Sequence, residues 1–361
     1  MNYAGRLARL SDTLASREVD ALLVTDLVNV RYLTGYTGSN GAVVARPDGA
    51  VFLTDFRYLE RVAPLREYVE VQQATQDLIR HVGSRWAVLA PGASRVGFEA
   101  AHLSVAALGE LTEAAGTVEL VPLSGVVEQL RVVKDDDEVA AIRRSAALLE
   151  TIYERIAGEG LAGRREVDVA WRVHELLHEM GATGVSFDPI VASGDAGALP
   201  HAEPRDRAIE VGDLVTLDIG GVLDGYCSDC TRTFATGPVA EDLAEIYDLV
   251  LRAQLAALDA VRPGVTGVDA DAAARDVIEA AGHGGNFQHG TGHGVGLQIH
   301  EAPRLSRTAS EQPLLAGSVV TVEPGVYLPE ALGVRIEDLV VVRADGCEVL
   351  TGLGKELTVV S

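Results

Sequence analysis

The fold of this chain can be deduced outward from one run, Leu214-Val-Thr-Leu-Asp-Ile-Gly-Gly-Val-Leu-Asp-Gly-Tyr-Cys-Ser-Asp-Cys-Thr-Arg-Thr-Phe234. Two β-rich runs flank the turn signal Leu223-Asp224-Gly225, a pattern that predicts an antiparallel hairpin. If the turn centres between Leu223 and Asp224, then Asp218 and Asp229 lie directly opposite one another, with their Cβ atoms about 5 Å apart on one face. Their like charges would repel, so this hairpin must have a way to balance them.

A second pair of acidic residues repeats the problem. The runs 319–323 and 334–342 bracket Pro329-Glu-Ala-Leu-Gly333, and a hairpin centred there sets Glu323 opposite Glu337. Four buried carboxylates without partners would cost several kcal/mol each, so they must be protonated, paired with arginine or bound to cations. Two divalent metal ions meet this need best. The alternative is that each pair faces solvent on an ordinary strand, and the recurrence of the pattern disfavours it.

Three histidines lie in the glycine-rich segment between the two hairpins, His289-Gly-Thr-Gly-His293-Gly-Val-Gly-Leu-Gln-Ile-His300-Glu301. Histidine is the commonest nitrogen ligand of metal ions and a proton carrier near neutral pH. Glycine lets the backbone approach a ligand closely. A lone histidine is more often a packing residue, but three in this context indicate a functional site.

Several motifs together resemble those of the pita-bread metallopeptidases, and within them the Xaa-Pro peptidases, aminopeptidase P and prolidase. They are Ala198-Leu-Pro-His201-Ala-Glu-Pro204, the aspartate hairpin, the histidine segment, Val322-Glu-Pro-Gly-Val-Tyr327 and Gly333-Val-Arg-Ile-Glu-Asp338. The resemblance covers residues 135–358 closely. The amino-terminal third resembles the smaller α/β domain of that family.

The resemblance implies a ligand set for two divalent metal ions, made of Asp218, Asp229, His293, Glu323 and Glu337. Oxygen-rich ligation with one imidazole suits hard or borderline ions, so Mn²⁺ is the expected metal and Co²⁺ or Zn²⁺ the possible substitutes. Such a pair of ions activates water and polarises the scissile carbonyl.

The resemblance also implies roles for residues around the metals. Glu323 is expected to accept a proton, while His201 and His300 position the substrate and stabilise the developing oxyanion. His289 matches a residue on the proline side, and Tyr327 and Arg335 match a relay that orients Asp218. Arg304 has two open interpretations, a partner for a free proline carboxylate or a solvated loop arginine.

The expected substrates are small peptides with proline at the second position. Proline has no amide hydrogen in a peptide bond, so a dedicated pocket is required. Whether the substrate ends at the proline, as for a prolidase, or continues, as for aminopeptidase P, stays open. Two alternatives from other classes are a metal-free creatinase-type hydrolase and a non-catalytic pita-bread binding protein. Both are disfavoured because all five residues of the ligand set are present, as are His201 and His300 on the substrate side.

Two other motifs compete with this interpretation. His174-Glu-Leu-Leu-His178 fits a zincin pattern, but helical spacing turns both histidines away from the apolar face. Cys227-Ser-Asp-Cys230 has the spacing of a zinc knuckle, yet on a strand the two thiols point to opposite sides.

Composition bounds the remaining expectations. The chain has 361 residues, of which 47% are hydrophobic, and a net charge of −23, which disfavours nucleic acid and anionic membranes as partners. No apolar run approaches the roughly 20 residues that span a bilayer, and three cysteines indicate a reducing compartment. We therefore expect a cytoplasmic protein, and the family resemblance implies a homodimer.

Two domains are expected, an α/β domain over residues 1–125 and a catalytic domain over 126–361. Buried strands are predicted at 21–25, 42–45 and 51–54, with helices at 57–65 and 103–115. In the second domain, hairpins alternate with helical patterns, which indicates an α+β pita-bread fold with an antiparallel sheet backed by helices. The predicted helices span residues 137–156, 165–180, 241–261 and 268–281.

Overall fold

The computed structural model describes residues 1–329 and 331–360, which form two compact units, Met1–Arg131 and Val132–Ser361. The division falls after helix α6 (Val126–Arg131), whereas the sequence pattern placed it before this helix. Helix α6 stays with the first unit because Tyr32 Oη donates to the carbonyl of Leu130 at 2.9 Å and Arg131 Nη1 donates to Asn29 Oδ1 at 2.8 Å.

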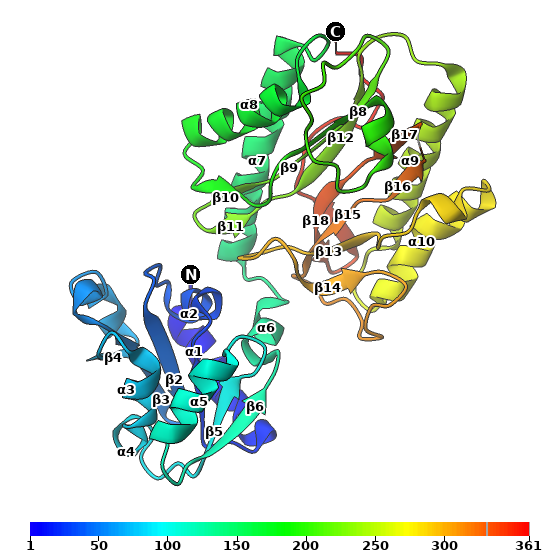
Figure 1. Ribbon diagram of the computed structural model, residues 1–361. Helices are drawn as coiled ribbons and strands as arrows, with labels where there is room; N and C mark the ends of the chain where they lie inside the picture. Colours follow the sequence, from blue (N-terminus) through cyan, green and yellow to red (C-terminus); the bar gives the residue numbers. More distant parts are fainter. Residues whose placement is uncertain (330, 361) are drawn as a thin grey trace. The chain divides into compact units, whose positions relative to one another are not determined.

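The first unit is built on one six-stranded sheet with the order β4-β3-β2-β1-β5-β6 (Figure 1). Pairings β1–β5, β5–β6 and β3–β4 are parallel and the others antiparallel. The central strand β1 is buried along its whole length, and β2 at every residue except Arg46, as expected for a sheet covered by helices. The strands are β1 (Ala21–Val24), β2 (Gly41–Arg46), β3 (Gly49–Thr54), β4 (Glu70–Gln73), β5 (Arg95–Glu99) and β6 (Glu119–Leu123).

Of the two helices predicted in this unit, the one over residues 103–115 is confirmed by α5 and the other is wrong. The helix predicted over residues 57–65 is instead two short 3-10 turns, Phe56–Tyr58 and Ala63–Glu67. Pro64 lies at the start of the second turn, and its ring and missing N–H prevent one continuous helix. The α-helices are α1 (Tyr3–Thr13), α2 (Leu27–Thr34), α3 (Leu78–Gly83), α4 (Trp86–Leu89), α5 (Val105–Ala114) and α6.

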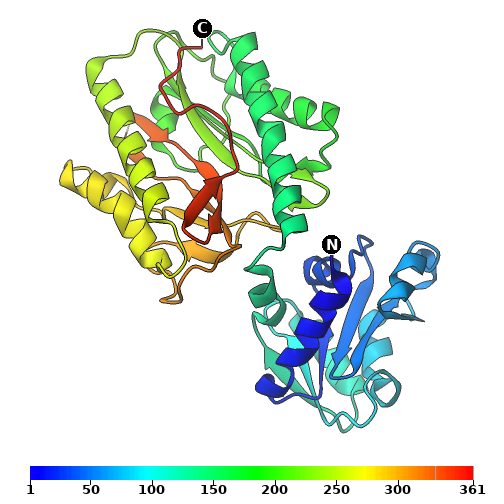
Figure 2. The ribbon, with the colours of Figure 1, turned by 180° about the vertical axis from the view of Figure 1, so that it is seen from behind.

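The second unit consists of antiparallel sheets backed by four long helices, which confirms the predicted fold class (Figures 1 and 2). Helices α9 and α10 pack on each other, and α7 packs on α8. Helix α7 begins with a capping box at Asp135, and the acidic residues of its first turn interact favourably with the positive end of the helix dipole. The helices are α7 (Asp136–Glu159), α8 (Glu166–Glu179), α9 (Glu241–Ala260) and α10 (Gly267–Ala280).

Its strands form sheets with the orders β11-β10-β7, β12-β9-β8, β14-β13-β15-β18-β19 and β16-β17. Their inward faces join the helices in two large apolar clusters. The strands are β7 (Gly184–Val185), β8 (Ile190–Ser193), β9 (Leu214–Ile219), β10 (Gly221–Leu223), β11 (Tyr226–Cys227), β12 (Cys230–Ala235), β13 (Gly292–Gly294), β14 (Glu301–Leu305), β15 (Val319–Val322), β16 (Gly325–Leu328), β17 (Leu332–Arg335), β18 (Asp338–Arg343) and β19 (Gly346–Val349). Of the helices in the described part of the chain, none combines the length and apolar character that a bilayer crossing requires.

The register of the aspartate hairpin differs from the prediction. Its turn is formed by Asp224 (φ 53°) and Gly225 (φ 83°), a two-residue turn that needs positive φ at both positions. Asp218 therefore pairs with Thr231, and the prediction that it lies directly opposite Asp229 is wrong. The shift is an even number of residues, so Asp229 keeps the same face of the sheet and lies diagonal to Asp218.

The second acidic hairpin has the predicted register. Val322 pairs with Asp338, and Gly325 pairs with Arg335. Continuing either pairing along the strands places Glu323 opposite Glu337. The predicted turn includes Glu330, which lies outside the described residues.

Behind the strands, one buried carboxylate joins elements that are distant in sequence. Asp338 is fully buried on β18 and accepts hydrogen bonds from Arg232 Nη2 on β12 at 2.8 Å and from Gln254 Nε2 on α9 at 2.8 Å. Thr351 Oγ1 donates to it at 2.9 Å, and Lys355 Nζ lies 2.5 Å away. Burial opposes ionisation of this carboxyl, but Arg232 and Lys355 outweigh burial and lower its pKa.

We predict that Asp338→Ala lowers the free energy of unfolding by about 3–5 kcal/mol, because it leaves the buried Arg232 guanidinium without its partner. The measurement is urea unfolding near neutral pH. Since the pKa of Asp338 is lowered on folding, its contribution should be present above the ordinary carboxyl range and fade as the pH falls through the lowered pKa. Asp345→Ala, in the exposed turn between β18 and β19, is the matched control and should change stability by less than about 0.5 kcal/mol. Equal stability of the two variants would contradict the assignment.

Candidate metal centre

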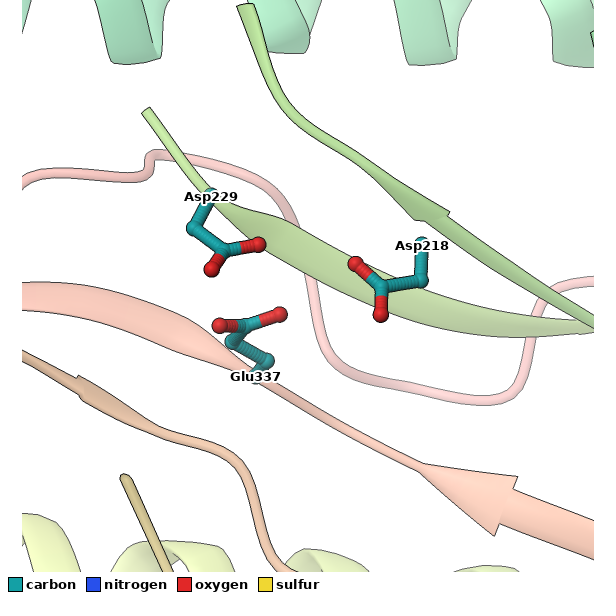
Figure 3. A group of neighbouring side chains, drawn as sticks. All are labelled: Asp218, Asp229 and Glu337. Carbon is teal, nitrogen blue, oxygen red and sulfur yellow. The ribbon is translucent and has the colours of Figure 1, made fainter. Parts of the chain in front are cut away.

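The fold brings all five predicted metal ligands into one cluster. Carboxylate oxygens of Asp218, Asp229 and Glu337 all lie within 4.8 Å of one another (Figure 3). His293 on β13 completes the group, with Nε2 3.3 Å from Glu323 Oε1 and 3.6 Å from Asp229 Oδ2. The ligands come from strands β9, β13 and the ends of β12, β15 and β18, so the cluster forms only when the sheets assemble.

The carboxylates of this cluster lack enough positive charge around them. Among the described residues, Asp218 Oδ1 and Glu337 Oε1 are buried without a hydrogen-bond partner. Burial raises the pKa of Asp218, Asp229 and Glu337, and the charges of the neighbouring carboxylates raise each of them further. Orphaned buried oxygens in a group of acids with one imidazole are the donor set that divalent cations require, so the residues fit a metal site.

His293 and Glu323 face each other at the edge of the cluster. Burial opposes the charge of Glu323, but its contact with His293 lowers the pKa of this carboxyl to about 2. Burial likewise disfavours the charged form of His293, and Glu323 outweighs it and raises the pKa of the imidazole. His293 Nδ1 lies 3.1 Å from the carbonyl oxygen of Gly294, which can only accept, so Nδ1 carries a hydrogen. Nε2 is therefore the nitrogen offered to a metal ion.

A chain of hydrogen bonds runs outward from Asp218. Arg335 Nη2 donates to Asp218 Oδ2 at 2.6 Å, and Arg335 Nη1 donates to Tyr327 Oη at 2.7 Å. Burial lowers the pKa of His289, whose Nδ1 lies 2.7 Å from the carbonyl oxygen of Gly290 and so carries the hydrogen. Neutral His289 then accepts from Tyr327 Oη at Nε2, across 2.9 Å. Tyr327 and Arg335, the predicted relay, thus lie in one hydrogen-bonded chain with Asp218, and His289 extends this chain outward.

Two threonines orient the ligands, and sequence reasoning missed both. Thr231 Oγ1 donates to Glu337 Oε2 at 2.7 Å and accepts from Arg335 Nε at 3.2 Å. Thr321 Oγ1 donates to Glu323 Oε1 at 3.0 Å and accepts from the backbone N–H of His293 at 3.0 Å. The available signal was spacing, because each threonine lies two residues from a ligand and so shares its face of the strand.

The remaining predicted residues lie at the rim of the cluster. The His300 ring lies 4.3 Å from the His293 ring, measured between centroids. His201 is exposed, and burial is the main cause that lowers the pKa of His289 and of His300. Arg304 is exposed on β14, paired in register with His293.

The histidines and thiols of the two competing motifs are not among the five predicted metal ligands. His174 and His178 are on α8, His174 half-buried beside the Trp171 ring at 5.8 Å and His178 exposed. Cys227 and Cys230 are buried and form no disulfide within the described residues, with Cys227 Sγ near the carbonyl of Leu297 and Cys230 Sγ near that of Glu337.

Comparison with known proteins identifies relatives along the whole chain. The model of metallopeptidase family M24 matches residues 140–344, and that of the creatinase/prolidase N-terminal domain matches residues 6–133. The Xaa-Pro dipeptidase of Pyrococcus furiosus is 33% identical over 358 residues, covering 98% of this chain and 99% of its own. The structure of the Xaa-Pro dipeptidase from Bacillus anthracis gives a TM-score of 0.96 at 39% identity, covering 99% of this chain and 100% of that one. The X-Pro aminopeptidase from Thermotoga maritima gives 0.89 at 31%, covering 98% and 100%.

We predict that Asp229→Asn stabilises the metal-free protein and abolishes most of its stabilisation by metal. The folded-state pKa of Asp229 is raised, so the metal-free protein loses stability as the pH rises above the ordinary carboxyl value of 3.8. At pH 7 the amide should raise Tm without metal by about 2–4 °C, the effect of about 1 kcal/mol in a domain of this size. The measurement is thermal unfolding with chelator and with added Mn²⁺.

Asp224→Asn is the matched control for this experiment. It removes an acid from the exposed turn of the same hairpin, and asparagine tolerates the positive φ found there. It should leave both Tm values unchanged. A lower metal-free Tm for Asp229→Asn, or an unchanged response to Mn²⁺, would remove Asp229 from the ligand set.

Proposed function

The chain belongs to metallopeptidase family M24 and is a metal-dependent Xaa-Pro peptidase, and we propose that it is a dipeptidase whose substrate ends at the proline. The observation that supports this choice over an aminopeptidase is the position of Arg304. It is the cross-strand partner of His293, and such partners have Cβ atoms about 4.5–5.5 Å apart on one face. Within residues 1–329 and 331–360 its guanidinium has no hydrogen bond or ion pair.

An exposed arginine beside the metal cluster suits a substrate with a free carboxylate. In an Xaa-Pro dipeptide the proline carboxylate is separated from the scissile carbonyl by a single residue. The planar guanidinium of Arg304 binds a carboxylate with two parallel hydrogen bonds. A longer peptide would place a neutral amide at the same position and lose this charge-assisted contact.

We further propose two metal ions, with Mn²⁺ as the physiological metal. Asp218, Asp229, Glu323 and Glu337 carry four negative charges when ionised, and a single divalent ion would leave an excess in a buried site. Two ions balance the four carboxylates. The oxygen-rich donor set with one imidazole favours manganese over softer metals, with cobalt or zinc as substitutes.

The proposed mechanism assigns each residue a step. Divalent ions held by the five ligands would polarise the scissile carbonyl and acidify the attacking water. The carboxylate of Glu323 would act as the general base and accept the proton from that water. His201 and His300 donate hydrogen bonds to the carbonyl oxygen as negative charge develops on it. The proton held by Glu323 then passes to the leaving proline nitrogen.

The relay of His289, Tyr327 and Arg335 acts on the ligand geometry in this mechanism. Arg335 holds Asp218 in one orientation with a short charge-assisted hydrogen bond, and Tyr327 holds Arg335. Neutral His289 lies at the outer end of the relay, where its ring contributes to the wall on the proline side.

The proposal also covers the setting of the enzyme. The three cysteines, all among the described residues, form no disulfide, which favours a reducing compartment and hence the cytoplasm. A homodimer is proposed on the family resemblance.

We predict that the metal-stripped protein is inactive and that added Mn²⁺ restores hydrolysis of Ala-Pro, with much slower cleavage of Ala-Pro-Ala and none of Ala-Ala-Ala. The measurement is release of alanine, with a chelator control. Preferential cleavage of Ala-Pro-Ala would identify an aminopeptidase instead. Loss of all three activities with metal present would favour the creatinase-type hydrolase or the binding protein.

A second prediction isolates Arg304. Arg304→Gln should raise KM for Ala-Pro by about 10-fold to 100-fold, because the charge-assisted contacts of a bidentate pair contribute roughly 1.5–3 kcal/mol. The KM for Ala-Pro amide, which lacks the carboxylate, should change little. Arg307→Gln, an exposed arginine in the same segment, is the matched control. An equal effect on both substrates would assign Arg304 to structure and not to carboxylate binding.

A further inference from the structure

The segment 193–205, which carries His201, is closed at its base by a single side chain. The carboxylate of Glu166 accepts the backbone N–H of Ser193 at one end of the segment, at 2.9 Å. Its other oxygen accepts the backbone N–H of Arg205 at the opposite end, at 2.8 Å. Glu166 is fully buried at the start of α8, so no water competes for these bonds.

Side chains at the two ends reinforce this closure. Ser193 Oγ donates to Glu166 Oε1 at 2.6 Å. Arg205 Nε donates to Glu166 Oε2 at 3.2 Å, and Arg205 Nη2 donates to the carbonyl of Ser193 at 3.0 Å. Arg205 also pairs with Asp195 inside the segment, at 3.1 Å. Glu166 and Arg205 therefore link the two ends of the segment, and Arg207 Nη1 adds a hydrogen bond to Ser193 Oγ.

The far part of the segment reaches the metal cluster. The carbonyl of Pro200, directly before His201, accepts from Arg335 Nη1 at 3.2 Å. The backbone of Gly197 lies so close to β17 that a Cβ there would be 3.0 Å from the nitrogen of Gly333. Arg335, which orients Asp218, thus also holds the tip of the segment.

We propose that Glu166 is a positioning residue for the reaction, because it clasps both ends of segment 193–205 and so sets the place of His201. This inference rests on the proposed role of His201 in the mechanism. The clasp depends on two acceptor oxygens of one ionised carboxylate, one for each end of the loop. Glutamine has nearly the same shape but a single acceptor oxygen, so one backbone N–H would lose its partner.

The test is a double-mutant cycle of Glu166→Gln with His201→Ala, measured as kcat for Ala-Pro at saturating Mn²⁺. A misplacement of about 1 Å at a reacting centre can lower turnover 100-fold, so E166Q should reduce kcat by about 10-fold to 100-fold. In the His201→Ala background E166Q should reduce kcat by less than about 2-fold, because the residue that it positions is already absent. The Tm increase on adding Mn²⁺ should be the same in E166Q and in the unaltered protein.

Glu175→Gln is the matched control, since Glu175 is exposed on the same helix and bonds only within it. Hydrogen exchange is the second measurement, and in E166Q it should speed up within 193–205 and not in β9 or β12. If E166Q does not fold, Ser193→Ala removes one bond of the clasp and serves in the same cycle.

Multiplicative effects of E166Q and H201A on kcat, or unchanged exchange in the loop, would overturn the inference. Full activity of H201A alone would contradict the proposed role of His201. It would also remove the reason to expect that Glu166 affects the reaction through His201. That result is distinct from failure of the dipeptidase assignment, which the substrate comparison decides.

Discussion

The mutual repulsion of the carboxylates of Asp218, Asp229, Glu323 and Glu337 is the constraint on which the second unit depends. Their burial raises the energy of any state in which all four are ionised and unbalanced, and Figure 3 shows three of them converging on a common point. The same repulsion between the carboxylates explains why the cluster is suited to binding metal ions. A cluster that is costly without cations binds cations strongly, and the family relationship shows that this chain is a metal-dependent peptidase.

Residues at increasing distance from the cluster reduce the energetic cost of burying these carboxylates. Closest to the cluster, Arg335 supplies a positive charge and threonine hydroxyls supply donors that fix single carboxylate oxygens. Farther out, Asp338 ties β12, β18, α9 and the C-terminal segment together with the positive charges of Arg232 and Lys355. The sheet that carries the ligands is thereby anchored on the side away from the metals, which keeps the ligand positions from relaxing apart.

Different parts of the site are held with different firmness. The ligands lie on paired strands, where backbone ladders leave little freedom. His201 lies on a loop outside any strand, and its place depends on side-chain contacts at the base and the tip of that loop. This division suits a peptidase, because ligand geometry must stay constant while the groups around the scissile bond admit a substrate and release two products.

The family and the ligand set followed from motifs that resemble those of the pita-bread metallopeptidases. The two acidic pairs followed from the residues themselves, because alternation along a strand and spacing around a turn are local properties that place a side chain on one face. The diagonal placement of Asp229 did not follow from the sequence. The hairpin turn is formed by Asp224 and Gly225 and is not centred between Leu223 and Asp224, and this choice depends on backbone φ values that the sequence does not reveal. Thr231 and Glu166 also escaped sequence reasoning. Their partners lie far along the chain, and only the packed tertiary structure decides which distant donors and acceptors meet.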